Sequence, residues 1–212
     1  ILLNGGTLKI QESLILDRDQ IETEGGRLVL QKGAVLNQGA VLKLDNGTLE
    51  LGDNLTLVDS NLESAQGRLK LLDNVSLIIP AAVSFREIQL QQKTLALDSS
   101  VTSLTVTEQL LIDHAEAGII RNQAEMVFKG GVRIDQGSKL SLDNQSQIQP
   151  GNIILNGGNL EVFGPPNTDT SALPTGVSVL RPSTVKIAPG VLFLSDNLSL
   201  QDSFTIHFES SE

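Results

Sequence analysis

The chain has 212 residues, a formal charge of −10 and no cysteine, tryptophan or tyrosine. The acidic balance argues against binding nucleic acid or docking on an anionic membrane, because both need clustered lysine and arginine. The lack of cysteine excludes disulfides and thiolate chemistry, and no apolar run approaches the ~18 residues that a membrane-spanning helix needs.

Aliphatic residues recur with one period of about twenty through the first 85 residues. Three sets of positions share this period: Leu8, Leu28, Leu49 and Leu69; Leu16, Leu36, Leu57 and Leu77; and Ile21, Val41, Leu62 and Val83. The apolar residues alternate with polar neighbours, as in Leu49-Glu50-Leu51. That alternation is typical of short strands with one buried face.

Glycine, asparagine and aspartate separate the expected strands, at 4–6, 24–26, 45–47, 53–54 and 73–74. These residue types tolerate the left-handed backbone of a sharp corner. Three short strands and three corners in each repeat predict a β-solenoid. We expect a single right-handed parallel β-helix over residues 1–212, with about ten coils. A β-sandwich is the alternative, but a sandwich does not require equal spacing in three sets.

Asparagine recurs at the expected corners, and we assign it a structural role. The corner residues are Asn46, Asn54, Asn74 and Asn197. Asn54 and Asn74 are expected to form a ladder in which the stacked side-chain amides bond each other. Serine or threonine two residues further on makes each of these sites a glycosylation triplet. An outward hydroxyl beside a corner asparagine produces the same triplet, and we favour that interpretation.

The second half is less regular, and its longer intervals predict loops inserted at corners. The longest is residues 164–176, where three prolines cannot continue a parallel ladder. We expect this segment to protrude as a contact loop, with Pro165, Pro166, Asn167 and Asp169 as its candidate contact residues. The apolar start Ile1-Leu2-Leu3 predicts either a longer natural chain or an end that meets another subunit.

Catalytic and metal-binding sites are weakly supported. Asp53 and Asp73 are expected about 4.8 Å apart in stacked strands, close to the spacing of paired carboxylates in glycoside hydrolysis. Both belong to Asp-Asn corners that recur, so turn geometry explains them better. The acidic stretch 17–24 has oxygen ligands suited to calcium, but a solvated acidic surface is favoured. His114 and His207 are isolated, and we assign no catalytic, cofactor or metal residue.

The phrase Asn-Gly-Gly-Thr-Leu-Lys-Ile at residues 4–10 has variants at 24–30, 45–51 and 156–162. It resembles the passenger regions of bacterial autotransporters and filamentous-haemagglutinin-like exoproteins. The resemblance implies a right-handed β-helix exported to the surface of Gram-negative bacteria, and many of those proteins are adhesins.

The expected function is therefore a non-catalytic rod segment of a secreted or cell-surface adhesin-like protein. Its expected partners are a host-cell or matrix surface, through a glycan or protein receptor, and no cofactor is expected. Two alternatives stay open. One is a carbohydrate-active enzyme, either a polysaccharide lyase or a hydrolase. The other is a filament subunit that self-associates end to end.

Overall fold

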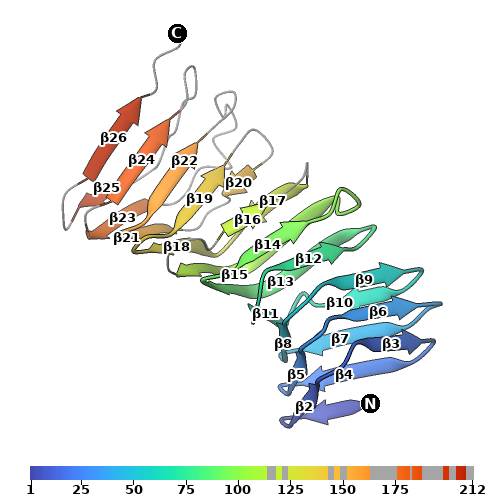
Figure 1. Cartoon of the computed structure of the whole chain (residues 1–212). Helices are drawn as coiled ribbons and strands as arrows, with labels where there is room; N and C mark the ends of the chain where they lie inside the picture. Colours follow the sequence, from blue (N-terminus) through green and yellow to red (C-terminus); the bar gives the residue numbers. More distant parts are fainter. Residues whose placement is uncertain are drawn as a thin grey trace.

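The computed structural model describes residues 1–113, 118–120, 124–142, 146–148, 152–162, 176–181, 183–187, 198–200 and 204–208. Within these ranges the regular elements are β-strands, and all of their pairings in the sheets are parallel. The strands stack as a β-solenoid. Figure 1 shows the first strands at one end of the stack and the last strands at the other.

Sheet A forms one side of the first four turns and contains β1 (Leu2–Asn4), β4 (Gln20–Glu24), β7 (Val41–Asp45) and β10 (Asn61–Glu63). Sheet C forms the side that follows sheet B along each turn. It contains β3 (Leu14–Asp17), β6 (Ala34–Asn37), β9 (Leu55–Val58), β12 (Val75–Ile78), β14 (Thr94–Leu97) and β16 (Gly118–Ile120).

Sheet B is the longest sheet and runs the length of the stack. Its main path is β2 (Thr7–Ile10), β5 (Arg27–Leu30), β8 (Thr48–Leu51), β11 (Arg68–Leu71), β13 (Ala82–Gln91), β15 (Ser103–Asp113), β18 (Gly131–Asp135), β21 (Asn152–Asn156), β23 (Gly176–Arg181) and β25 (Leu198–Leu200). Off this path lie β17 (Glu125–Phe128), which pairs with β15, and β20 (Ser146–Ile148), which pairs with β17. Sheet D contains β19 (Lys139–Leu142), β22 (Asn159–Val162), β24 (Ser183–Ile187) and β26 (Phe204–Phe208).

The expected number of coils was wrong, because about seven turns are found rather than ten. Three strands per turn fit sheets A, B and C. Towards the end of the chain the described strands supply two sides of a turn, as β25 and β26 do. Counting twenty residues to every turn assumes a regularity that the later part of the chain lacks. The right-handed sense of winding and the single domain stay predictions.

The first predicted aliphatic column is confirmed. Leu8, Leu28, Leu49 and Leu69 are direct register partners in sheet B, and the last three are fully buried. Leu30, Leu51 and Leu71 stack beside them and are also buried. Each turn therefore covers the apolar side chains of the next, and the buried area between turns stabilises the stack.

The other two columns need correction. Leu77 pairs with Leu55 rather than Leu57, a shift of two residues that keeps the same side chains facing inward. Ile21 pairs with Leu42 rather than Val41, and Leu42 then pairs with Leu62. The corner before Leu42 contains one more residue than the corner before Ile21, which moves the buried position along by one.

The corners before β2, β5 and β8 explain the recurring Gly-Gly and Asn-Gly phrases. The first residue of the corner is left-handed, with φ of 71° at Gly5, 66° at Gly25 and 55° at Asn46. The second residue packs against the preceding turn. A Cβ on Gly47 would lie 1.9 Å from the Thr23 hydroxyl oxygen. That distance is shorter than any real contact, so only glycine fits at this position.

Candidate functional site

The Asp-Asn corners hold successive turns together. The Asn54 side-chain oxygen accepts a hydrogen bond from the backbone N–H of Ser76 at 2.8 Å, and that of Asn74 accepts from Thr94 at 2.9 Å. The preceding aspartates, Asp53 and Asp73, accept from the backbone N–H of the asparagine that follows. Each asparagine thus bonds the backbone of the next turn, not the neighbouring amide that we expected.

The Asp73 carboxylate is held by contacts within its own corner and by a lysine of the next turn. The backbone N–H of Asn74 contributes most to lowering the pKa of the Asp73 carboxyl, and the Lys93 ammonium contributes next. The Lys93 nitrogen lies 3.3 Å from this carboxylate. The interactions of Asp73 therefore stabilise the corner and favour its ionised form.

Asn46 belongs to a different kind of corner. Its left-handed backbone starts the turn into β8, and its side-chain oxygen accepts a hydrogen bond at 2.9 Å from Arg86, two turns further on. Arg86 occupies the position where the earlier turns have Gly6, Gly26, Gly47 and Gly67. Its backbone N–H donates to the Gly67 carbonyl. The structural role predicted for Asn46 therefore includes a link across two turns.

Several predicted positions lie outside the described residues. These are Asn197, the contact-loop residues Pro165, Pro166, Asn167 and Asp169, and His114.

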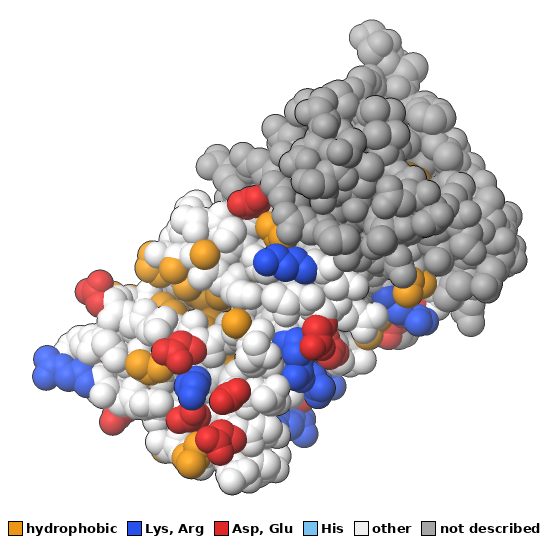
Figure 2. Space-filling model, turned by 180° about the vertical axis from the view of Figure 1, so that it is seen from behind, with side chains coloured by type: hydrophobic (Ala, Val, Ile, Leu, Met, Phe, Trp, Pro, Cys, Tyr) orange, Lys and Arg blue, Asp and Glu red, His pale blue; other side chains and the backbone are white. Residues whose placement is uncertain are grey.

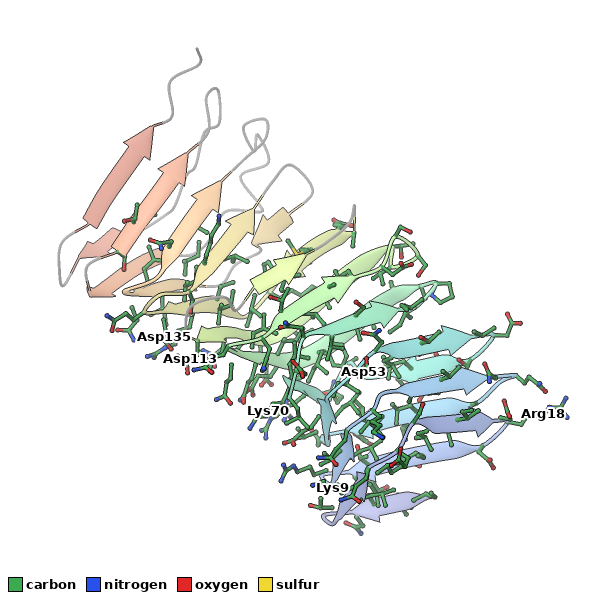
Figure 3. The ribbon with its side chains drawn as sticks, viewed as in Figure 1. Lys9, Arg18, Asp53, Lys70, Asp113 and Asp135 are labelled. Carbon is green, nitrogen blue, oxygen red and sulfur yellow. The ribbon has the colours of Figure 1, made fainter. Side chains whose placement is uncertain are left out.

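The outward side of sheet B carries charges of both signs in cross-strand register. The Arg27 guanidinium lies 2.6 Å from the Glu50 carboxylate, whose side chain is 5% exposed. The hydrogen bond to Glu50 raises the pKa of Arg27. Arg68 pairs directly with Glu87 at 3.3 Å. Figure 3 shows Lys9 and Lys70 on this side of the stack, and Figure 2 shows basic and acidic side chains interleaved on the described surface seen from behind.

The acidic stretch 17–24 does not gather into a metal site. The Glu22 carboxylate bonds the Lys43 ammonium of the next turn and raises the pKa of that lysine. Among the residues that the structure describes, no group of three or more acidic or histidine side chains is placed to hold a metal ion.

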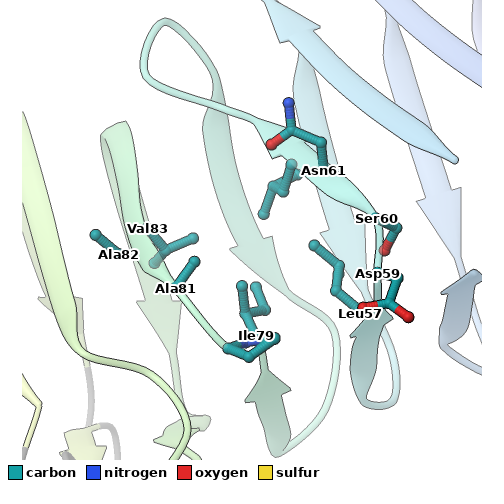
Figure 4. A pocket seen from close by; sticks show the side chains of 10 residues that line it. Leu57, Asp59, Ser60, Asn61, Ile79, Ala81, Ala82 and Val83 are labelled. Carbon is teal, nitrogen blue, oxygen red and sulfur yellow. The ribbon is translucent and has the colours of Figure 1, made fainter. Parts of the chain in front are cut away.

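A groove lies between β10 and β13 in the early turns, and the spacing of the apolar residues did not predict it. Among the described strands, sheet A ends at β10, which pairs with β7 alone, while the first half of β13 pairs with β15. Two adjoining hollows, of about 290 and 400 Å³, lie between β10 and β13 and share Leu62 and Ala82 in their linings. Figure 4 shows Asn61 on one side of the first hollow and Ala82 and Val83 on the other.

The sequence contains one signal for this groove. The corner glycine is replaced by Arg86, and β13 continues through the corner position from Ala82 to Gln91, with a register shift against β15 between Phe85 and Glu87. The first half of β13 pairs with β15 and does not pair with β10 of sheet A, while its second half pairs with β11.

Comparison with protein-family models, with curated proteins and with solved structures finds no match for this chain. The resemblance drawn from the short repeated phrases therefore gains no support from relatives. Within the described ranges, no helix has the length and apolarity to cross a membrane.

Proposed function

We propose that this chain is a non-catalytic rod segment of a secreted or cell-surface adhesin-like protein. The observation that carries the proposal is the column Leu8-Leu28-Leu49-Leu69, in which each turn pairs with the next through parallel ladders and buried leucines. A stack of this kind is stiff along its axis because each turn is fixed by both of its neighbours. A stiff rod holds binding residues at a defined distance from the point where it is attached.

The proposed partner is a glycan or protein receptor on a host cell or its matrix. The outward side chains and the 164–176 loop, with Pro165, Pro166, Asn167 and Asp169, are the proposed contact surface. The proposed location is outside the cell, with the Gram-negative outer surface favoured by the repeated Gly-Gly phrases. The interleaved charges on sheet B are compatible with a polar, wet contact.

The experiment is a binding assay on cultured host cells, immobilised matrix proteins and a glycan array. The chain is compared with a variant in which residues 164–176 are replaced by a glycine-serine linker of equal length. The proposal predicts saturable binding that the loop variant loses, with the unfolding midpoint unchanged. Absence of binding to all three surfaces, or depolymerisation of glycans on the array, would contradict the proposal.

Self-assembly end to end is the second candidate, favoured by the first turn. Its outer strands β1, β2 and β3 are the terminal strands of their sheets, and Ile1, Leu2 and Ile15 are 68%, 58% and 63% exposed. An unpaired apolar strand edge recruits other chains. Filaments whose length rises with protein concentration in electron micrographs, and which vanish when Leu2 is replaced by lysine, would support this candidate.

A further inference from the structure

We infer that the groove between β10 and β13 binds an extended peptide segment of a partner protein, which adds a strand to the open edge of sheet A. This binding site is independent of the rod function proposed above, since it depends on a local break in one sheet.

Two strand edges face the groove without pairing to each other. In β10, the Asn61 N–H donates to the Ala40 carbonyl on the β7 side. Backbone groups alternate in direction along a strand, so the N–H and C=O of Leu62 point towards the groove. In β13, the Ala81 carbonyl accepts from Thr102 on the β15 side. The N–H and C=O of Ala82 therefore point towards the groove from the opposite strand.

These opposed edges are what an added strand requires, because main-chain hydrogen bonds supply the affinity in this mode of peptide recognition. The small exposed side chain of Ala82 keeps the entrance wide. At the far end the Ser64 hydroxyl donates a hydrogen bond of 2.6 Å to the Ser84 carbonyl. Ser64 is buried, so the groove is closed there and its length matches a short segment of about four residues.

The lining indicates the side chains that the segment carries. Apolar atoms of Leu57, Leu62, Ile79 and Val83 line the first hollow, and Leu62 packs against the core. An inward apolar side chain would thus continue the buried column. The charged side chains lining the two hollows are Asp59, Asp45, Glu63 and Lys43, and Lys43 is already bonded to Glu22. The occupant is therefore a segment in which apolar and basic residues alternate.

The first test uses a fluorescein-labelled octapeptide of alternating valine and lysine, followed by fluorescence anisotropy and amide hydrogen exchange. Binding is expected to slow exchange at Leu62 and Ala82, while Asn61, which is already bonded within the sheet, changes little. N-methylation of the peptide at alternate residues removes two hydrogen bonds along one edge, and we expect roughly tenfold weaker binding. A peptide with glutamate in place of lysine is expected to bind more weakly than the parent.

The second test reverses one charge on the protein. Asp59→Lys is expected to weaken binding of the valine-lysine peptide roughly threefold to fivefold at moderate salt. Asp59 has a φ of 50°, and Arg18 holds the equivalent corner position with a φ of 61°, so a basic residue is compatible with the fold there. Asp19→Lys is the matched control, because Asp19 is an exposed acid at an equivalent corner where sheet A is fully paired. It is expected to leave binding unchanged.

Four results would overturn the inference. The first is no binding of the peptide at millimolar concentration. The second is equal binding of the parent and N-methylated peptides, and the third is protection that falls on strands other than β10 and β13. The fourth is concentration-dependent protection of Leu62 and Ala82 without peptide, which would show that a second copy of the chain fills the groove.

Discussion

Replacing Leu49 by alanine tests whether the leucine column holds the turns together. The Leu49 side chain is fully buried between Leu28 and Leu69 in adjacent strands. The substitution removes three carbon atoms, and at ~0.8 kcal/mol per buried CH₂ the lost transfer free energy is about 2.4 kcal/mol. Neighbours on both sides are held by their ladders and cannot collapse fully, so the cavity raises the total cost to about 3–5 kcal/mol.

The assay is urea unfolding of the chain and its variants, monitored by far-ultraviolet circular dichroism. Leu8→Ala is the matched control, because Leu8 belongs to the same column but lies in the first turn and is half-buried. Its cost is expected near 1 kcal/mol, since partial exposure reduces the lost transfer free energy. Equal costs for the two variants, or a cost below about 1 kcal/mol for Leu49→Ala, would refute the stacked column.

Three further predictions concern the corners. Gly47→Ala is expected to lower the free energy of unfolding by more than about 2 kcal/mol, because the added Cβ overpacks the corner. Gly6→Ala is the control, since a Cβ on Gly6 would meet no atom within 4 Å. Thermal melts of this control are expected to be nearly unchanged. Asn74→Ala is expected to cost about 1 kcal/mol in urea unfolding through loss of a hydrogen bond between turns, and Asn74→Asp, which keeps the acceptor, is expected to cost less. The lowered pKa of Asp73 stabilises the fold above the ordinary aspartate pKa of about 4, and this contribution is lost as the pH falls through the lower folded value. Unfolding measured between about pH 6 and pH 2 should therefore show a shallower acid loss for Asp73→Asn than for the unmodified chain, and identical slopes would contradict that assignment.

The fold was predictable because aliphatic period and corner chemistry agree in the first four turns. The nearly constant spacing of Leu8, Leu28, Leu49 and Leu69 indicates which residues stack, and each is followed by an inward partner two residues on. The shift of Leu77 to Leu55 was not predictable, because two registers that differ by two residues bury the same face. The period alone cannot distinguish these two registers. In the observed register, the backbone N–H of Ser76 donates a hydrogen bond to the Asn54 side chain.

The candidate site was harder to predict than the fold. The aliphatic spacing from Leu62 to Val83 suggests a continuous ladder, yet the structure leaves these two positions on opposite sides of a groove. The groove coincides with a change elsewhere in the turn, where Arg86 replaces a corner glycine and β13 continues through the corner position with a register shift between Phe85 and Glu87. A missing glycine in one repeat is visible in the sequence, but its effect on the neighbouring side depends on how the whole turn closes.

The central claim is that residues one turn apart are direct neighbours in parallel register, and engineered cysteine pairs test it most directly. The chain has no cysteine of its own, so any disulfide reports on the introduced pair alone. Thr48 and Arg68 are register partners, whereas Lys70 lies two residues further along. Thr48→Cys with Arg68→Cys should oxidise to an intramolecular disulfide, since parallel neighbours about 4.8 Å apart are within disulfide reach. Thr48→Cys with Lys70→Cys should stay reduced under the same conditions, and the opposite order of reactivity would contradict the stacked β-solenoid.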